Sequence, residues 1–354
     1  MIRWREGLVV EVREQRDGPT EVVVRTADGD VPALAYAHLV GEPVVGDRVL
    51  LNVTALELGL GTGGFALVVA IPARLPADVP QRGHVVKARY TPLQVTVLAA
   101  DEQGSPHHDV LRDADDINGM PVAVADLHSA LPAVLAGLRV SHPDARVVYV
   151  MSDGGALPLA LSRTVPPLRA AGWLAATVTV GQAYGGDVEA VTLHTGLLAA
   201  RHVLRADAAV VTQGPGNLGT GTRWGFSGVA SGEAVNAVNT LGGRAVAALR
   251  LSAVDERERH RGVSHHSLTA LGRVALTPAD VVVPTLDGRL GEQVRAACAP
   301  LAERHRLVDV DVAGLIDALR QSPVPLSSMG RGLDDDPAYF LAAAAAGRHL
   351  ASLL

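Results

Sequence analysis

Hydrophobic and polar residues alternate in short runs along the first 71 residues. Four runs favour β structure, GLVVEVRE, TEVVVRT, GDRVLLNV and FALVVAIP, and the turn-forming stretches RDGP, ADGD and LGTGG separate them. Strands at this spacing predict a small barrel or curled sheet. We therefore predict a β-rich domain over residues 1–75. Two further apolar runs, GHVVKARY and LQVTVLAA, predict a β hairpin with an acidic loop in a connecting segment over 76–120.

Apolar runs then alternate with Ala- and Leu-rich amphipathic stretches over residues 121–354. The runs include ARVVYVM, ATVTV, DAAVVT, RAVAALRLS and ADVVVPTL. This alternation is typical of βαβ units, in which a crossover makes successive strands parallel. We predict an α/β domain with a Rossmann-like, mostly parallel sheet of about five to seven strands and flanking helices.

Composition narrows the function classes. The net charge is -6 and no basic run could follow a phosphate backbone, so nucleic acid is not expected as a partner. No apolar stretch is long enough to span a bilayer and the first residues do not resemble a signal peptide, so we predict a cytoplasmic protein without membrane contact. The single cysteine, Cys298, lies in a helical pattern and predicts a buried structural thiol. Abundant Ala and Leu fit a homo-oligomer face as well as a core.

Acidic residues follow two of the predicted strands. In an open parallel sheet, ligands collect beyond the carboxyl ends of the strands. Asp153 follows ARVVYVM, and Asp187 follows ATVTV with Glu189 close behind. We interpret Asp153 and Asp187 as candidate general bases or metal ligands, and Glu189 as a weaker one. The alternative is that each Asp caps a helix. His128 is a further candidate, with a partly buried structural role as its alternative.

A glycine-rich loop, VVTQGPGNLGTGTRWGFSG, follows a third strand. Its first glycines match G-x-G-x-x-G and a helix is expected after it, so backbone amides could hold an anion. No lysine follows, which argues against a P-loop, and the loop is long for a dinucleotide turn. The alternative is a long turn that uses glycine for its backbone conformation. The residues predicted to bind the anion are Gly214, Gly216, Gly219, Thr220, Gly221 and Thr222.

A stretch rich in His and Arg follows a fourth strand. Arg259 and Arg261 are candidate clamps for phosphate or carboxylate, and His265 and His266 are candidate acids. A divalent metal is a further hypothesis, with Asp187, His260 and His265 as candidate ligands, although the spacing matches no zinc signature. The alternative is a solvated charged face in which Ser264 caps a helix. No other cofactor is indicated.

Four motifs together resemble a known family: YVMSDGGALPLALS, TVTVGQAYGGDVEAV, ADAAVVTQGPGNLGTGTRWGFSG and RERHRGVSHHSLTALG. They are similar to a bacterial family of uncharacterised proteins, catalogued as domain of unknown function 3866. The likeness covers nearly the whole chain. The family segment tends to read G-H-A-F-G-G-D where this chain has Gln182 and Tyr184, so a histidine there is not indispensable. The resemblance implies relatedness and carries no activity with it.

Three functional hypotheses follow. The leading one is an enzyme, a hydrolase or transferase, that binds a phosphorylated or nucleotide-like small molecule with polar clusters from successive strand ends. The second is an NAD(P)-dependent oxidoreductase that uses the glycine loop for the pyrophosphate. The third is a non-catalytic ligand-binding or scaffold protein. All three share a small anionic ligand as the expected partner.

Overall fold

The chain folds into two compact units, Met1–Val97 and Leu98–Leu354. The computed structural model describes residues 1–15, 18–60, 63–80 and 83–354. The boundary between the units lies inside the connecting segment predicted over 76–120, and the limits at 75 and 120 stay predictions.

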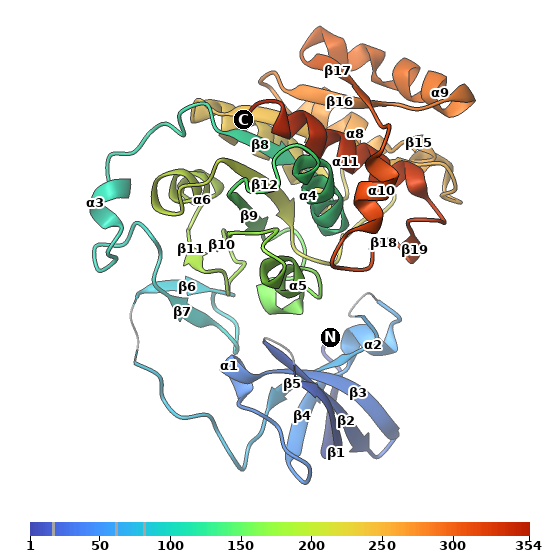
Figure 1. Cartoon of the computed structure of the whole chain (residues 1–354). Coiled ribbons are helices and arrows are strands. Elements are labelled where there is room, and N and C mark those ends of the chain that lie inside the picture. The colour runs from blue at the N-terminus through green and yellow to red at the C-terminus, as the bar shows by residue number, and fades with distance from the viewer. Residues whose placement is uncertain (16–17, 61–62, 81–82) are drawn as a thin grey trace. The chain divides into compact units, whose positions relative to one another are not determined.

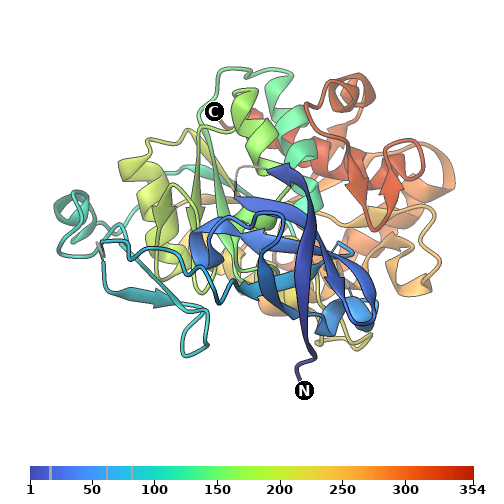
Figure 2. The same ribbon diagram turned by 90° about the horizontal axis from the view of Figure 1, so that it is seen from below.

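The first unit contains a closed five-stranded barrel, as the alternating pattern predicted (Figures 1 and 2). The barrel order is β1-β2-β3-β5-β4, and every pairing except that of β3 with β5 is antiparallel. Val9, Val24 and Leu51 lie in its core. The strands are β1 (Trp4–Gln15), β2 (Pro19–Thr26), β3 (Gly29–Tyr36), β4 (Arg48–Asn52) and β5 (Ala66–Ala70), with short helices α1 (Ala37–Val40) and α2 (Thr54–Glu57). An antiparallel hairpin follows, β6 (Val85–Lys87) and β7 (Val95–Val97).

The second unit is built on an eight-stranded parallel sheet, which confirms the predicted Rossmann-like α/β fold. The order is β11-β10-β9-β12-β8-β13-β16-β17. The prediction missed one strand, because β11 has only two residues and carries no periodic pattern. The strands are β8 (Pro121–Val124), β9 (Val147–Ser152), β10 (Ala176–Thr179), β11 (Val188–Glu189), β12 (Ala208–Gln213), β13 (Arg244–Ala248), β16 (Asp280–Thr285) and β17 (Arg306–Asp311).

Helices cover both faces of this sheet (Figure 1). Along β9, Val148 and Val150 pack with one helix layer, and Val147, Tyr149 and Met151 pack with the other. Because both faces are buried, such strands read as continuous apolar runs. The first layer contains α6 (Leu193–Leu198), α7 (Ala230–Thr240) and α9 (Gly288–Cys298), and the second contains α4 (Leu131–Arg139), α5 (Val165–Ala170), α10 (Leu315–Arg320) and α11 (Pro337–Ala351).

Shorter elements complete the second unit. Cys298 is a buried free thiol at the end of α9, as predicted, and burial raises its pKa to about 12. Within the described residues, no helix combines the length and apolarity needed to cross a membrane. The remaining elements are α3 (His108–Leu111), α8 (His265–Thr269), the pair β14 (Leu251–Ser252) and β15 (Gly262–Val263), and the pair β18 (Ser327–Ser328) and β19 (Arg331–Gly332).

Candidate functional site

Strands β8 and β12 are neighbours in the sheet, but the chain leaves them toward opposite faces. The chain enters α4 in the second helix layer after β8, and α7 in the first layer after β12. Such a switch point opens a crevice beyond the carboxyl ends of the strands, where α/β proteins bind ligands. A cavity of about 300 Å³ lies at this position, and it also reaches the ends of β9 and β10.

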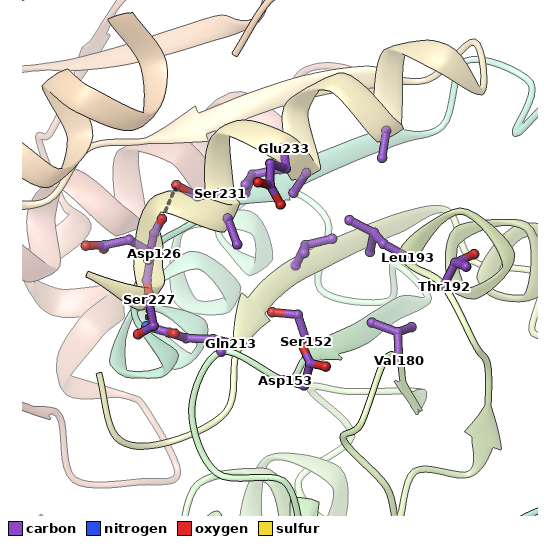
Figure 3. Close-up of a pocket in the computed structure, with 18 of the residues that line it drawn as sticks. Asp126, Ser152, Asp153, Val180, Thr192, Leu193, Gln213, Ser227, Ser231 and Glu233 are labelled. Carbon is purple, nitrogen blue, oxygen red and sulfur yellow. Dashed lines mark hydrogen bonds between the residues drawn. The ribbon is translucent and has the colours of Figure 1, made fainter. Parts of the chain in front are cut away.

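Polar side chains from several elements line this switch-point cavity. Figure 3 shows Glu233 on α7 at one side of the cavity and Ser152 and Asp153 from the end of β9 at the other. Asp126 follows β8 and lies close to α7, so the cavity carries three carboxylates. No arginine or lysine is among the described residues that line it. The cavity therefore favours ligand groups that donate hydrogen bonds over a bare phosphate.

Two buried acceptor atoms in this cavity lack hydrogen-bond partners. Asp126 is 8% exposed and Gln213 is 5% exposed, yet neither Asp126 Oδ2 nor Gln213 Oε1 accepts a hydrogen bond from any residue that the structure describes. Gln213 Nε2, in contrast, donates to the Asp126 carbonyl oxygen at 2.8 Å. Since an unpaired buried acceptor costs about 1–3 kcal/mol, a hydrogen-bond donor that reached either atom would be stabilised there.

A cluster of three histidines adjoins Asp126. His266 Nδ1 lies 3.5 Å from Asp126 Oδ2 and 3.1 Å from a guanidinium nitrogen of Arg250. The ring centroids of His260 and His265 lie 4.8 and 4.5 Å from that of His266. Phe226, at the end of the glycine loop, stacks on the His266 ring at 3.8 Å. The predicted acid candidates His265 and His266 are therefore brought together beside the cavity.

Burial and neighbouring cations keep two of these histidines neutral. Burial, followed by the charges of Arg250 and Arg257, lowers the pKa of His260 to about 3. Burial, followed by the charges of His266 and Arg259, lowers the pKa of His265 to about 4. Each imidazole thus has one unprotonated ring nitrogen at neutral pH.

The two aspartates predicted from the strand ends lie in different places. Asp153 lines the cavity, and its carboxylate accepts a hydrogen bond from the backbone N–H of Gln182 at 2.8 Å. Asp187 binds Arg169 at 2.6 Å and the amide of Thr177 in β10 at 2.8 Å. Neither caps a helix, because a turn follows Asp153 and strand β11 follows Asp187. The structure therefore gives Asp187 partners outside the cavity, and its catalytic and metal roles stay predictions.

The glycine loop between β12 and α7 is largely bonded to itself. Thr220 N donates to Gly225 O at 2.7 Å, and the Thr220 and Thr222 hydroxyls lie 3.1 Å apart. Gly219 forms an isolated antiparallel β-bridge with Phe226. The expected helix follows as a 3-10 turn, Ser227–Val229, and then α7. Gly214 and Gly216 line a second cavity of about 280 Å³, which also contacts residues at the start of α4.

The two arginines predicted as clamps have different surroundings. Arg261 donates to the carbonyl oxygen of Asp255 at 3.2 Å. Arg259 is exposed and forms no hydrogen bond with any residue that the structure describes. Its guanidinium lies 3.8 Å from the point where a Cβ on Gly221 would be. The structure therefore brings Arg259 and the tip of the glycine loop together, as the anion hypothesis requires.

His128 belongs to a buried hydrogen-bond network near the second cavity. Its Nδ1 lies 2.9 Å from the Tyr149 hydroxyl and its Nε2 lies 2.8 Å from Ser162 Oγ. Complete burial lowers the pKa of His128 to about 4 from its usual value of 6.5. This arrangement matches the alternative of a buried structural histidine.

The His128 network predicts a pH-dependent stability. Between pH 6.5 and 4 the unfolded chain binds a proton at this histidine and the folded chain does not. The free energy of unfolding therefore decreases by about 3 kcal/mol as the pH falls through this window. We expect the substitution His128→Gln to remove most of this loss. Urea unfolding at pH 7, 5.5 and 4 measures it, with the exposed His142→Gln as control. Parallel pH profiles for the wild type and His128→Gln would contradict the assignment.

Sequence reasoning missed four residues of the site. Asp126 directly follows the apolar end of β8, and Gln213 ends β12 just before the glycines, so the strand-end rule could have found both. Glu233 lies within a helix pattern and Arg250 within an apolar run, and no signal distinguishes them. Only their positions at the cavity and beside Asp126 identify them.

Comparison with known proteins places the chain in a family. A search of curated proteins gives no significant match. The family described as protein of unknown function, DUF3866, matches residues 32–347, which include most of the second unit and begin within the barrel. The chain belongs to the DUF3866 family.

Proposed function

We propose that the chain is an enzyme that binds a nucleotide-like metabolite in the switch-point cavity and hydrolyses it or transfers a group from it. The observation that supports the proposal is a pair of buried acceptors, Asp126 Oδ2 and Gln213 Oε1, that accept no hydrogen bond from the residues the structure describes. Ribose hydroxyls or an exocyclic amine would supply the donors that these atoms lack. The position beyond the carboxyl ends of parallel strands supports the same class of ligand.

The phosphate of such a ligand has a separate candidate contact. A phosphate inside the cavity would meet Asp126, Asp153 and Glu233, which repel it. Arg259 is exposed beside Gly221 at the tip of the glycine loop. We assign phosphate binding to Arg259 and the backbone of this loop.

Asp126 is the carboxylate that we assign to the reacting end of the ligand. Arg250 lies 3.6 Å from it and His266 lies 3.5 Å from it, and all three side chains are at least nine-tenths buried. Burial and the neighbouring guanidinium of Arg250 restrict the orientation of this carboxylate. Asp126 is therefore suited to orient a ligand hydroxyl and accept its proton, and Asp153 at the exposed rim is suited to position the same ligand.

Ligand screening tests this proposal. Nucleosides, their 5′-monophosphates and the oxidised and reduced forms of NAD and NADP are screened by thermal shift, because a ligand of the folded state raises Tm. We expect a nucleoside-containing ligand to stabilise the protein, with conversion followed by chromatography. If only the dinucleotides bind, the oxidoreductase hypothesis replaces this one. If no probe binds, the proposal fails.

The substitution Asp126→Asn is expected to weaken binding of the hit by about 10- to 100-fold, because a hydrogen bond to a charged group contributes about 1.5–3 kcal/mol. Calorimetric titration measures this effect. Glu233→Gln in the same cavity is the matched control, since its exposed carboxylate is screened by water and should change affinity less than about threefold. Equal effects of the two substitutions would contradict the role of Asp126.

A further inference from the structure

We propose that His260, His265 and His266 form a binding site for a divalent transition metal, with Zn²⁺ as the best-fitting ion. One ring nitrogen from each histidine lies within 4.8 Å of the others. The three residues come from two short segments, Glu258–His260 and the start of α8, which strand β15 joins in the chain. This inference does not rest on the proposed function, although both use the carboxylate of Asp126.

The donor set fits zinc. Three imidazole nitrogens and an open position are typical of zinc sites that bind a water or a substrate. Zn–N bonds of about 2.0–2.1 Å place ligand nitrogens about 3.4 Å apart, so small ring movements from the present separations suffice. Harder ions such as Mg²⁺ prefer oxygen ligands and fit this set poorly.

One nitrogen of the cluster has no hydrogen-bond partner among the described residues. This atom is His265 Nε2, which is buried. The His265 ring lies 5.0 Å from that of His260 and 4.5 Å from that of His266. A buried imidazole nitrogen without a partner costs free energy, and a metal shared with the two neighbouring rings would satisfy it.

The other two histidines have neighbours of the kind that support metal ligands. In a metal-binding histidine, the second ring N–H usually donates a hydrogen bond to an oxygen atom. His260 Nδ1 lies 2.8 Å from Ser264 Oγ, so its Nε2 is left for the metal. His266 Nδ1 lies 3.5 Å from Asp126 Oδ2, and Phe226 stacks on its ring. Asp126 Oδ2 has two lone pairs and can accept from both His266 and a ligand in the cavity.

Arg250, Arg257 and Arg259 oppose a cation here, and Arg250 contacts His266 directly. Arg250 lies 3.1 Å from His266 Nδ1 and donates to it in the present arrangement. The carboxylate of Asp126, 3.6 Å away, offsets its charge. Metal binding therefore requires His266 to exchange its Arg250 contact for a donated hydrogen bond to Asp126. The site should consequently bind zinc more weakly than a structural zinc site does.

Zinc titration tests the site. Tag-free protein is stripped with a chelator and titrated with Zn²⁺ against a chromophoric competitor, and Co²⁺ is added separately to record its visible absorption. We expect one Zn²⁺ per chain and a Co²⁺ spectrum of low-symmetry nitrogen coordination. The substitutions His260→Gln and His265→Gln should each lower Zn²⁺ affinity by more than about 100-fold, since loss of outer partners alone costs 10- to 100-fold.

The exposed His142→Gln is the matched control and should bind Zn²⁺ like the wild type. Circular dichroism checks that each variant is folded, and His265→Gln removes no hydrogen bond that the structure describes at Nε2. Absence of stoichiometric Zn²⁺ in the folded wild type, or equal binding by His265→Gln and the wild type, would overturn the proposal. Because nucleoside binding is measured separately, the metal site and the proposed function can fail independently.

Discussion

The substitution Gly347→Ala is expected to destabilise the second unit by about 3 kcal/mol or more. Helices α4 and α11 pack so closely that a Cβ on Gly347 would lie 1.8 Å from the carbonyl oxygen of Val134, and one on Gly137 would lie 1.8 Å from that of Ala344. The two backbones would have to separate, which disturbs the core around them. In an unobstructed helix the same substitution stabilises by about 1 kcal/mol, so the expected sign is reversed.

Chemical unfolding of Gly347→Ala and Gly137→Ala measures this effect. Gly272→Ala is the matched control, because Gly272 is also helical and its added Cβ would lie only 3.4 Å from the flexible end of Leu301. The control should change the free energy of unfolding by less than about 1 kcal/mol. If Gly347→Ala and Gly272→Ala behaved alike, the close packing of α4 against α11 would be refuted.

The substitution Asp255→Ala is expected to cost about 3 kcal/mol of stability. Asp255 is 2% exposed, and its carboxylate accepts hydrogen bonds from Arg257 and Arg331 at 2.9 and 3.0 Å. The hydrogen bonds from Arg257 hold the pKa of Asp255 well below its usual range. Removing one partner of a buried ion pair leaves the other charge uncompensated and typically costs about 3–5 kcal/mol. Because Arg257 is partly exposed, we expect the cost of Asp255→Ala to lie at the lower end of this range.

Asp309→Ala provides the control for Asp255. Asp309 pairs with Arg295 at 3.2 Å, but both side chains are more than half exposed, so its loss should cost less than about 1 kcal/mol. Urea unfolding compares the two variants. Acid should weaken the wild type in the same way, because the depressed pKa of Asp255 gives stability that disappears as the pH falls below the usual range of a carboxyl. If both substitutions lowered the free energy of unfolding by the same amount, the ion pairs of Asp255 with Arg257 and Arg331 would contribute no more to stability than an exposed pair.

Most of the fold could be predicted because the two units impose different periodicities. Barrel strands such as β4, with one buried face, alternate, and parallel strands with two buried faces read as apolar runs, so both units were recognisable. Ser264 was recognisable as a helix cap, and it accepts the amide hydrogen of His266. Strand β11 was not recognisable, because two residues have no period.

The candidate site was predictable only in part. The strand-end rule identified Asp153, and the histidine-rich motif identified His265 and His266, which the structure brings close together. The same rule gave Asp187 equal weight, although the chain after β10 turns back and places Asp187 against Thr177. A rule based on chain order cannot show which way a loop turns.

The sequence by itself determined the fold class, the family and the polar clusters at the strand ends, because periodicity and local motifs depend only on residues that are close together in the sequence. The tertiary structure alone decided which clusters share a site. Asp126 and His266 are 140 positions apart in the numbering but 3.5 Å apart in space, since β8 lies at the centre of the sheet beside β12 and β13. Burial, which leaves Asp126 Oδ2, Gln213 Oε1 and His265 Nε2 without a hydrogen-bond partner among the described residues, is likewise a property of the packed chain only.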